Sequence, residues 1–325
     1  MKVFIVGGTG AIGKRLIPQL LTSGHEVVAM TRSPGKSDEL RILGAEVAIA
    51  DALNRDSVMR AVMRAEPEVV VHQLTALTAV TSFKNFDKEF ALTNRLRTEG
   101  LDNLRQAARA TGAKRVVAQS YGNWNYERTG SRVKSEEDPL DPSPPANQVE
   151  SLEAIRHLES RLTEAEDIEG IALRYGWFYG PGTSLSESGE ITEMVRKRRF
   201  PIVGSGAGVW SFVHIDDAAG AAVAAIERGT PGIYNVADDQ PAPVSEWLPE
   251  LARILGAKPP RHLPVWLGRL VAGDVGVSFM TQIRGASNAK AKRELGWTPR
   301  YPSWREGFRT GLREAHQTSP APAGP

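Results

Sequence analysis

The stretch VFIVGGTGAIGKRL, from Val3 to Leu16, joins a short apolar run to an amphipathic segment through a glycine-rich turn. The apolar run is typical of a buried strand, and the segment from Ile12 to Thr22 follows a helical period. Glycine lets a backbone approach a pyrophosphate closely, and the amino end of a helix offers it free N–H groups. The stretch therefore predicts a dinucleotide-binding turn, with a tight turn that binds nothing as the alternative. The residues predicted to line it are Gly7, Thr9, Gly10, Ala11, Ile12 and Gly13.

The same alternation of strand and helix patterns continues through the first half of the chain. Further strands are predicted at Glu26–Thr31, Glu46–Ala50, Val69–His72, Arg115–Gln119 and Gly170–Arg174. Helices are predicted at Ser37–Leu43, Arg55–Arg64, Phe86–Ala110 and Asn147–Leu162. This order predicts an α/β fold, a Rossmann-type doubly wound parallel sheet with helices on both faces. The last helix has a predicted capping pair, Asn147 and Glu150, at its start.

The second half of the chain differs in character, because glycines, prolines and tryptophans separate shorter elements. It predicts a smaller, interleaved C-terminal lobe. We expect residues 1–175, with 211–237 returning to them, to form the NAD(P)-binding domain. Residues 176–210 and 238–315 are expected to form the substrate-binding lobe. The proline-rich end, residues 316–325, is predicted to be disordered.

Composition excludes several classes of protein. The formal charge of +2 over 325 residues gives no reason to expect nucleic acid as a partner. There is no cysteine, and the six histidines lack paired ligand spacing, so neither disulfides nor a metal site is expected. No apolar run approaches the roughly 20 residues that span a bilayer. A cytoplasmic protein with a small-molecule substrate and no membrane partner is the prediction.

The second predicted strand ends in AMTRSPGK, which carries no acidic residue. Dinucleotide folds usually place an acidic side chain there for the adenosine 2′-hydroxyl, whereas arginine pairs with a 2′-phosphate. Thr31, Arg32 and Ser33 therefore favour NADP(H) as the cofactor, with NAD(H) as the alternative if Arg32 is only a solvated loop residue. Asp51 and Ala52, after the third predicted strand, are placed near the adenine, and a turn or capping role for Asp51 is the alternative.

Together these features resemble the extended short-chain dehydrogenase/reductases, the NAD-dependent epimerase/dehydratase family. The resemblance covers about residues 1–315. The motifs that carry it are GGTGAIG, VVHQLTA at Val70–Ala76, TNRLRTEGLDNLRQAARATGAKRVV at Thr93–Val117, LRYGWFYGPG at Leu173–Gly182, FVHIDDAAGA at Phe212–Ala221 and NAKAKRELGWTP at Asn288–Pro299. It implies an oxidoreductase whose cofactor lies across the carboxyl ends of the strands. Leu74, Thr75 and Ala76 would contact that cofactor.

The resemblance also implies a catalytic serine or threonine, a Tyr-x-x-x-Lys pair and a supporting asparagine. Asn94 matches the asparagine and Ser120 the serine. Aligning Glu159 with the family's later glutamate puts Ser151 at the tyrosine position and Ile155 at the lysine position. None of the six tyrosines has lysine four residues later, so the pair is absent from the sequence. Tyr121 remains as a candidate proton donor; Tyr126, another cleft residue, water and the substrate itself are the alternatives.

Three functions follow from this pattern. The first is NAD(P)-dependent reduction of a carbonyl in an apolar or aromatic small molecule without the usual tyrosine. The second is a nucleotide-sugar epimerase or dehydratase with a relocated base, where the basic run Arg196–Arg199 would favour an anionic substrate. A solvated helix face also explains that run. The third is a non-catalytic NADP(H)-binding sensor.

The predicted substrate lobe is rich in aromatic residues, which favours the first function. Packing within the lobe is the alternative role for each of them. The aromatic side chains predicted to contact substrate are Trp124, Tyr126, Trp177, Tyr179 and Trp210. Arg174 and His214 are further polar candidates, and Asp216 and Asp217 are expected to cap the helix that follows. We also expect a homodimer in which Phe86–Ala110 and Asn147–Leu162 pair across a two-fold axis.

Overall fold

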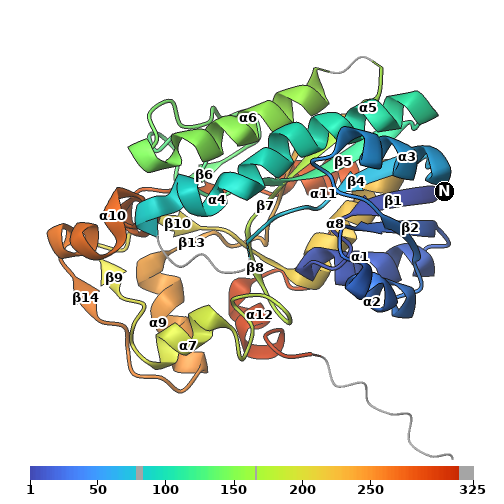
Figure 1. Cartoon of the computed structure of the whole chain (residues 1–325). Helices are drawn as coiled ribbons and strands as arrows, with labels where there is room; N and C mark the ends of the chain where they lie inside the picture. The colour runs from blue at the N-terminus through green and yellow to red at the C-terminus, as the bar shows by residue number, and fades with distance from the viewer. Residues whose placement is uncertain (78–82, 165–166, 315–325) are drawn as a thin grey trace, which may run out of the picture.

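A seven-stranded parallel sheet forms the centre of the molecule, in a computed structural model that describes residues 1–77, 83–164 and 167–314 (Figure 1). The strands are β1 (Lys2–Val6), β2 (Glu26–Thr31), β3 (Glu46–Ile49), β4 (Val69–His72), β5 (Arg115–Tyr121), β7 (Glu169–Tyr175) and β12 (Gly232–Val236). Their order is β12-β7-β5-β4-β1-β2-β3, and every pair is parallel. The chain reverses direction across the sheet between β1 and β4, where such folds bind ligands. The predicted Rossmann-type fold is confirmed.

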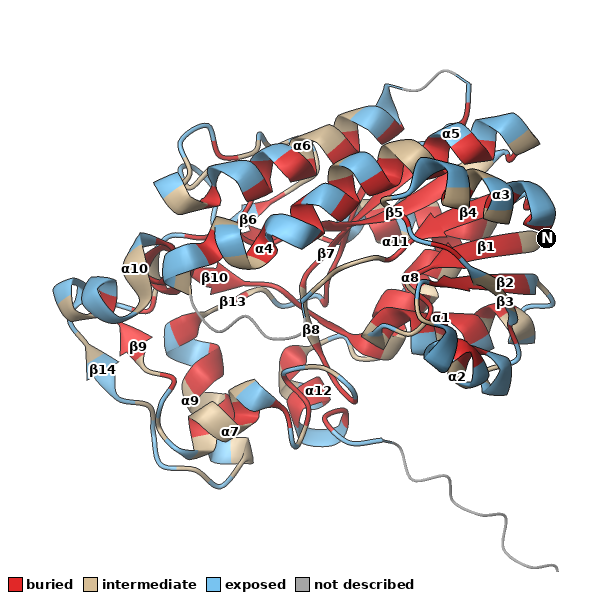
Figure 2. Cartoon of the chain, viewed as in Figure 1, coloured by how far each residue is buried: buried red, intermediate tan, exposed pale blue. Residues whose placement is uncertain are grey.

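Two helical layers cover the sheet (Figure 1). One contains α1 (Ala11–Thr22), α2 (Ser37–Ile42), α8 (Ile215–Arg228) and α11 (Ala289–Leu295). The other contains α3 (Arg55–Ala65), α4 (Phe86–Arg95), α5 (Leu101–Thr111) and α6 (Val149–Thr163). Figure 2 shows the strands buried between these layers, and each helix turns its exposed residues outward. Near-continuous apolar strands such as β1 and β4 follow from this burial on both faces.

The long helix predicted at Phe86–Ala110 is interrupted. A π-helical stretch, η3 (Leu96–Gly100), lies between α4 and α5, although the backbone stays helical throughout. His72 at the end of β4 donates from Nε2 to the carbonyl oxygen of Leu96 at 2.9 Å. Single π turns occur frequently at functional sites and cannot be read from apolar periodicity.

The second lobe packs around an apolar core that also includes side chains of α4 and α6. Its helices are α7 (Glu190–Arg196), α9 (Val244–Ile254), α10 (Val265–Thr281) and α12 (Trp304–Thr310). Short strand pairs connect them: β8 (Trp177–Tyr179) with β11 (Phe212–His214), β9 (Ile202–Val203) with β14 (His262–Leu263), β10 (Val209–Trp210) with β13 (Ala242–Pro243), and β6 (Val133–Lys134) with β15 (Gly285–Ala286). The boundaries predicted for the two lobes stay a proposal. The predicted disordered tail, from residue 316, lies outside the described residues. Among those residues no helix has the length and apolar character to cross a bilayer.

The start of α6 is capped from another helix, and the predicted capping pair is wrong. The carboxylate of Asp87, on α4, accepts hydrogen bonds from the backbone N–H groups of Glu150 and Ser151 at 3.1 and 2.9 Å. Asn147 instead donates its side-chain amide to the carbonyl oxygens of residues 83 and 84. A helix needs an acceptor for its first N–H groups but does not require that the acceptor be local.

We predict that Asp87→Ala lowers the free energy of unfolding by about 2 kcal/mol, because two N–H groups of α6 lose their acceptor. Glu150→Ala is the matched control, since the sequence pattern assigns the cap to the exposed Glu150. The control should change stability by no more than about 0.5 kcal/mol. Urea unfolding followed by circular dichroism measures both. A larger loss in the Glu150 variant would contradict the assignment.

Candidate functional site

The turn after β1 accepts only glycine at two positions. Gly7 has φ +100°, and a Cβ there would lie 2.6 Å from the carbonyl oxygen of Gln73. A Cβ on Gly13 would lie 2.3 Å from the carbonyl oxygen of Gly7. Gly10 begins α1 with no side-chain cap, and the first turn carries no acidic residue. The first N–H groups of α1 are therefore available to an anion, which fits a dinucleotide phosphate.

Arg32 follows β2 on the surface and is free to bind a ligand. Thr31 is buried, and its hydroxyl accepts from the backbone N–H of Ser33 at 3.2 Å, which fixes the turn on either side of Arg32. Among the described residues no ion pair or hydrogen bond engages the Arg32 side chain. Its guanidinium therefore fits a ribose 2′-phosphate, as NADP(H) carries.

The other predicted cofactor segments follow the carboxyl ends of β3 and β4. Asp51 makes a turn, since its Oδ1 accepts from the backbone N–H of Leu53 at 3.0 Å, and Asn54 caps α3. Ala52 is tied to α5 through its carbonyl oxygen, and Ala76 donates its N–H to the Thr93 hydroxyl. Since β4, β1, β2 and β3 are neighbours, all four segments lie along one edge of the sheet. Contact of Asp51, Ala52 and residues 74–76 with a cofactor stays a prediction.

The residue that the resemblance aligns with the family's tyrosine is buried and hydrogen-bonded. Ser151 is buried on α6, where its hydroxyl donates to Oδ1 of Asp87 at 2.6 Å. Asn94, on α4, donates its amide to the same hydroxyl at 3.1 Å. Ile155, at the lysine position, is fully buried in the apolar core of the second lobe. Neither residue can exchange a proton with a substrate, so α6 has a structural role where the resembled family has its acid and base.

Ser120, at the end of β5, belongs to a buried polar network. Its hydroxyl donates to the carboxylate of Glu159 at 2.6 Å. Arg174 pairs with both oxygens of that carboxylate at 2.7 and 2.6 Å, and its Nη1 donates to the Tyr126 hydroxyl at 3.1 Å. Tyr126 in turn donates to the side-chain oxygen of Asn235. The network links α6 to three strands of the sheet, and it occupies the proton of the Ser120 hydroxyl.

The ionisation states in this network are set by burial and by the ion pair. Burial opposes the charge on Arg174, but the bidentate pair with Glu159 outweighs it and raises the arginine pKa above its ordinary value. Burial raises the pKa of Tyr126 to about 12. Burial also raises the pKa of Tyr121, the half-buried last residue of β5, above its usual range. Both phenols therefore stay neutral near pH 7, and Tyr121 is the one that is not enclosed.

Most of the predicted substrate aromatics pack inside the lobe. Tyr179 lies against His214 and Phe308, with ring centroids 5.2 and 5.3 Å away, and Trp210 donates its Nε1–H to the carbonyl oxygen of Phe279. Tyr126 belongs to the polar network. These three side chains are at most 1% exposed, which favours a packing role, and their contact with a substrate stays a prediction. Trp177 is partly exposed, whereas Trp124 is buried and its ring lies tilted beside that of Tyr121; contact of these two with a substrate stays a prediction.

The region around β11 and α8 is structural, with one correction. His214 accepts from the backbone N–H of Asp216 through Nδ1, which caps α8, and its Nε2 bonds to the carbonyl oxygen of Gly311. Asp217 was expected to cap α8 as well. It instead accepts from the backbone N–H groups of Arg300 and Tyr301 at 2.8 and 3.0 Å, and so holds the segment before α12. A carboxylate in the first turn is free to serve whichever segment packs beside it.

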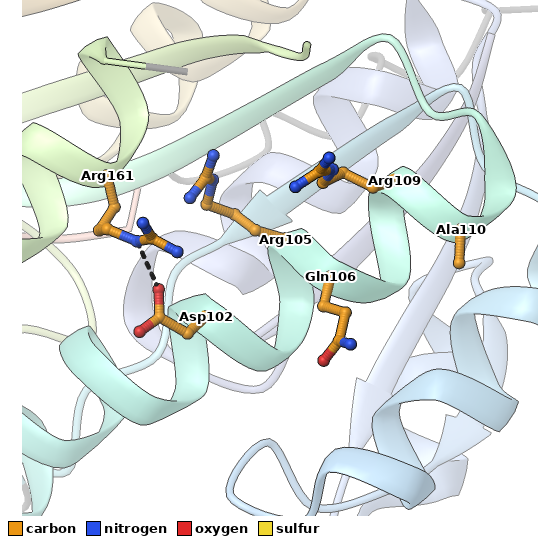
Figure 3. A pocket seen from close by; sticks show the side chains of 6 residues that line it. All are labelled: Asp102, Arg105, Gln106, Arg109, Ala110 and Arg161. Atoms are coloured by element: carbon orange, nitrogen blue, oxygen red, sulfur yellow. Dashed lines mark hydrogen bonds and ion pairs between the residues drawn. The ribbon is translucent and has the colours of Figure 1, made fainter. Parts of the chain in front are cut away.

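A surface hollow of about 560 Å³ lies elsewhere, over α5 and the end of α6 (Figure 3). It is lined by Asp102, Arg105, Gln106, Arg109, Ala110 and Arg161. Asp102 pairs there with Arg161 and His157 at 3.0 Å each. Since α5 ends just before β5 begins, this hollow lies toward the amino ends of the strands. It is thus remote from the edge that carries the predicted cofactor residues.

Sequence reasoning did not predict three residues that lie in or beside the candidate site. Asp87 and Glu159 hold Ser151 and Ser120, but no local pattern reveals partners that lie so far apart in the chain. Arg97 is buried within η3 and has an unpartnered Nη1. Its one sequence signal is a basic residue three positions after Asn94, which places both on one side of a helix.

Known proteins resemble the chain over most of its length. The family model described as NAD dependent epimerase/dehydratase family matches residues 3–237. A 3-diazoavenalumate denitrifying reductase from a Streptomyces species is 44% identical, with 95% of this chain and 99% of that relative covered. A 2-alkyl-3-oxoalkanoate reductase from Stenotrophomonas maltophilia is 28% identical, with 79% and 76% covered. The solved UDP-glucose 4-epimerase of Thermus thermophilus, in complex with NAD, has a TM-score of 0.72 and 25% identity, and the match covers 96% of this chain and 98% of that one.

We predict that Glu159→Gln lowers the free energy of unfolding by about 3 kcal/mol or more, because Arg174 is left as an uncompensated buried charge. Glu153→Gln is the control, since Glu153 pairs with Arg156 on the exposed side of the same helix. The control should shift stability by at most about 0.5 kcal/mol. Chemical denaturation compares the variants. Equal effects would show that the buried pair contributes no more than a surface pair.

Proposed function

The chain belongs to the NAD-dependent epimerase/dehydratase family, and we propose that it is an NADPH-dependent reductase of a small aromatic molecule. The observation that carries this proposal is the state of α6. Epimerases and dehydratases of sugars need a base that removes a proton, and neither Ser151 nor Ile155 can act as one. A reductase can function without that base if its acceptor is sufficiently electrophilic.

The residues of the sheet edge fit a dinucleotide. Gly7, Gly10 and Gly13 would let its phosphates approach the amino end of α1. Arg32 would pair with a 2′-phosphate, which supports NADP(H) over NAD(H). NAD(H) stays the alternative, since the family is described as NAD dependent and the Thermus relative holds NAD. The cytoplasmic location and the homodimer expected from the sequence likewise stay predictions.

An aromatic diazo compound is the preferred acceptor. NAD(P)H, when bound, would supply a hydride, and Ar–N₂⁺ would thereby be converted to Ar–H and N₂ with no proton required. This chemistry suits a site in which the Ser120 hydroxyl proton is already engaged by Glu159. The 44% identical relative is named as a denitrifying reductase of a diazo compound, which supports the same choice.

A carbonyl acceptor is the second candidate, because the Stenotrophomonas relative is named as a reductase of a 3-oxoalkanoate. A carbonyl oxygen that becomes a hydroxyl needs a proton. Tyr121 would supply it from its phenol, since this side chain is half-buried at the carboxyl end of β5. The aromatic side chains Trp124 and Trp177 would bind the apolar part of either acceptor.

We predict that the wild-type protein binds NADPH at least about tenfold more tightly than NADH, and that Arg32→Glu reverses this preference. The reason is that glutamate repels a 2′-phosphate and accepts from a 2′-hydroxyl. Arg261→Glu, which makes the same charge change on the exposed side of the second lobe, is the control and should leave both affinities unchanged. Fluorescence titration of each cofactor decides, and equal affinities in the wild type would exclude the NADP(H) preference.

We predict that the protein oxidises one NADPH for each N₂ released from an aryl diazonium salt. The assay combines absorbance at the NADPH band with mass spectrometry of ¹⁵N-labelled N₂, and a reaction without protein corrects for spontaneous decay. Aromatic ketones and UDP-glucose are run in parallel. Turnover of the ketones alone would favour reduction of a carbonyl. Conversion of UDP-glucose would favour a nucleotide-sugar epimerase. Cofactor binding without turnover of any of these compounds would favour a non-catalytic NADP(H)-binding sensor and contradict the proposal.

A further inference from the structure

Arg97 is a buried cation beside the proposed site. It lies in the π-helical stretch η3, one turn after Asn94, and its side chain is 3% exposed. The stretch packs against α6, whose residue at the lysine position is Ile155. Burial lowers the pKa of the Arg97 guanidinium to about 10, so it keeps its proton at neutral pH. The fold therefore places a buried positive charge in a stretch that packs against α6, the helix in which the lysine position is occupied by Ile155.

This charge has no partner among the described residues. The Nη1 of Arg97 makes no hydrogen bond there, and no ion pair involves its side chain. The carboxylate that acts on it electrostatically is Glu159, which already binds Arg174 through both oxygens and accepts from Ser120. Glu159 and Arg174 cancel, so the charge of Arg97 is left over. An unpaired buried charge is costly, and its retention points to a ligand that pairs with it.

The place of Arg97 on its helix favours a side chain that leans toward the proposed site. Side chains of a helix lean toward its amino end, which for Arg97 means toward Asn94 and the carboxyl edge of the sheet. Tyr121, which ends β5 at that edge, lies close enough to Arg97 to influence the pKa of the guanidinium. The side-chain oxygen of Asn94 is also buried without a hydrogen-bond partner. Two polar groups, one turn apart on the same helix, are thus unsatisfied near the half-buried Tyr121.

We propose that Arg97 binds a carboxylate of the aromatic molecule that the protein reduces, and so makes it selective for anionic acceptors. The inference rests on the proposed function. A guanidinium matches a carboxylate in geometry and charge, since two of its N–H groups can bond to the two oxygens at once. Because the carboxylate would enter a region shielded from water, the pair would be stronger than one on the surface. The acceptor is then recognised by its charge at one end and by aromatic packing along its ring.

Binding of 4-hydroxycinnamate and of its methyl ester tests the proposal by calorimetry with NADP⁺ present. The wild type should bind the acid at least about tenfold more tightly than the ester. Arg97→Met should bind both probes equally, with its NADPH affinity unchanged. Arg97→Lys should keep part of the preference, because it retains the charge without the planar fork. Arg105→Met is the matched control, since Arg105 is 7% exposed and has an unpartnered Nε, but it lines the remote hollow over α5.

Thermal unfolding separates this role from a structural one. Removing an unpaired buried charge should leave the melting temperature of Arg97→Met unchanged or raise it. A wild type without preference for the acid would overturn the inference, as would a preference that survives in Arg97→Met. Equal losses of NADPH and acid binding would assign Arg97 to the cofactor instead, which also overturns it. If Arg97→Met does not fold, Arg97→Lys provides the test. Loss of its preference for the acid over the ester, together with weakened NADPH binding, would also overturn the inference. These binding measurements stand apart from turnover, so a protein that discriminates the probes yet reduces no diazo compound would refute only the proposed function.

Discussion

The structure around the proposed site depends on the carboxylate of Glu159. A carboxylate buried between a helix and a sheet must be paired, and Arg174 pairs with both of its oxygens. That single requirement fixes α6 against β5 and β7. It also engages the hydroxyl of Ser120 and, through Arg174, the phenol of Tyr126. The same pairing leaves Arg97 without a counter-charge, so one buried ion pair determines both which groups are engaged and which cation remains free.

The loss of the acid–base pair has not weakened the helix that would carry it. Ser151 is held by Asp87 and Asn94, and Ile155 is packed in an apolar core. The Asp87 carboxylate serves twice, since it caps α6 and accepts from the Ser151 hydroxyl. The helix is thus as well anchored as a structural element requires. Together with a sheet edge that fits a dinucleotide, this is the pattern expected of a reductase whose acceptor needs little help from the protein.

The groups that suit phosphates and the groups that suit an aromatic ring lie in separate parts of the proposed site. The sheet edge presents backbone N–H groups and the exposed Arg32, which suit phosphates. The end of β5 presents the neutral phenol of Tyr121, with the ring of the buried Trp124 tilted beside it at 6.1 Å between centroids. An aromatic acceptor fits the second environment and a dinucleotide the first. Because Tyr126, Tyr179 and Trp210 are buried, fewer aromatic side chains are left to face a substrate.

The sequence by itself determined the sheet and the dinucleotide turn. For the strands in the first half of the chain, each predicted end lies within two residues of the observed end, because apolar periodicity and glycine placement are local signals. Gly7 and Gly13 could be chosen for the same reason, since a backbone that approaches another backbone tolerates no Cβ. Only the tertiary structure decided that Asp87 caps α6, that Glu159 binds Arg174 and that Arg97 has no partner. These facts depend on which distant side chains meet once the helices pack, and spacing along the chain carries no record of that.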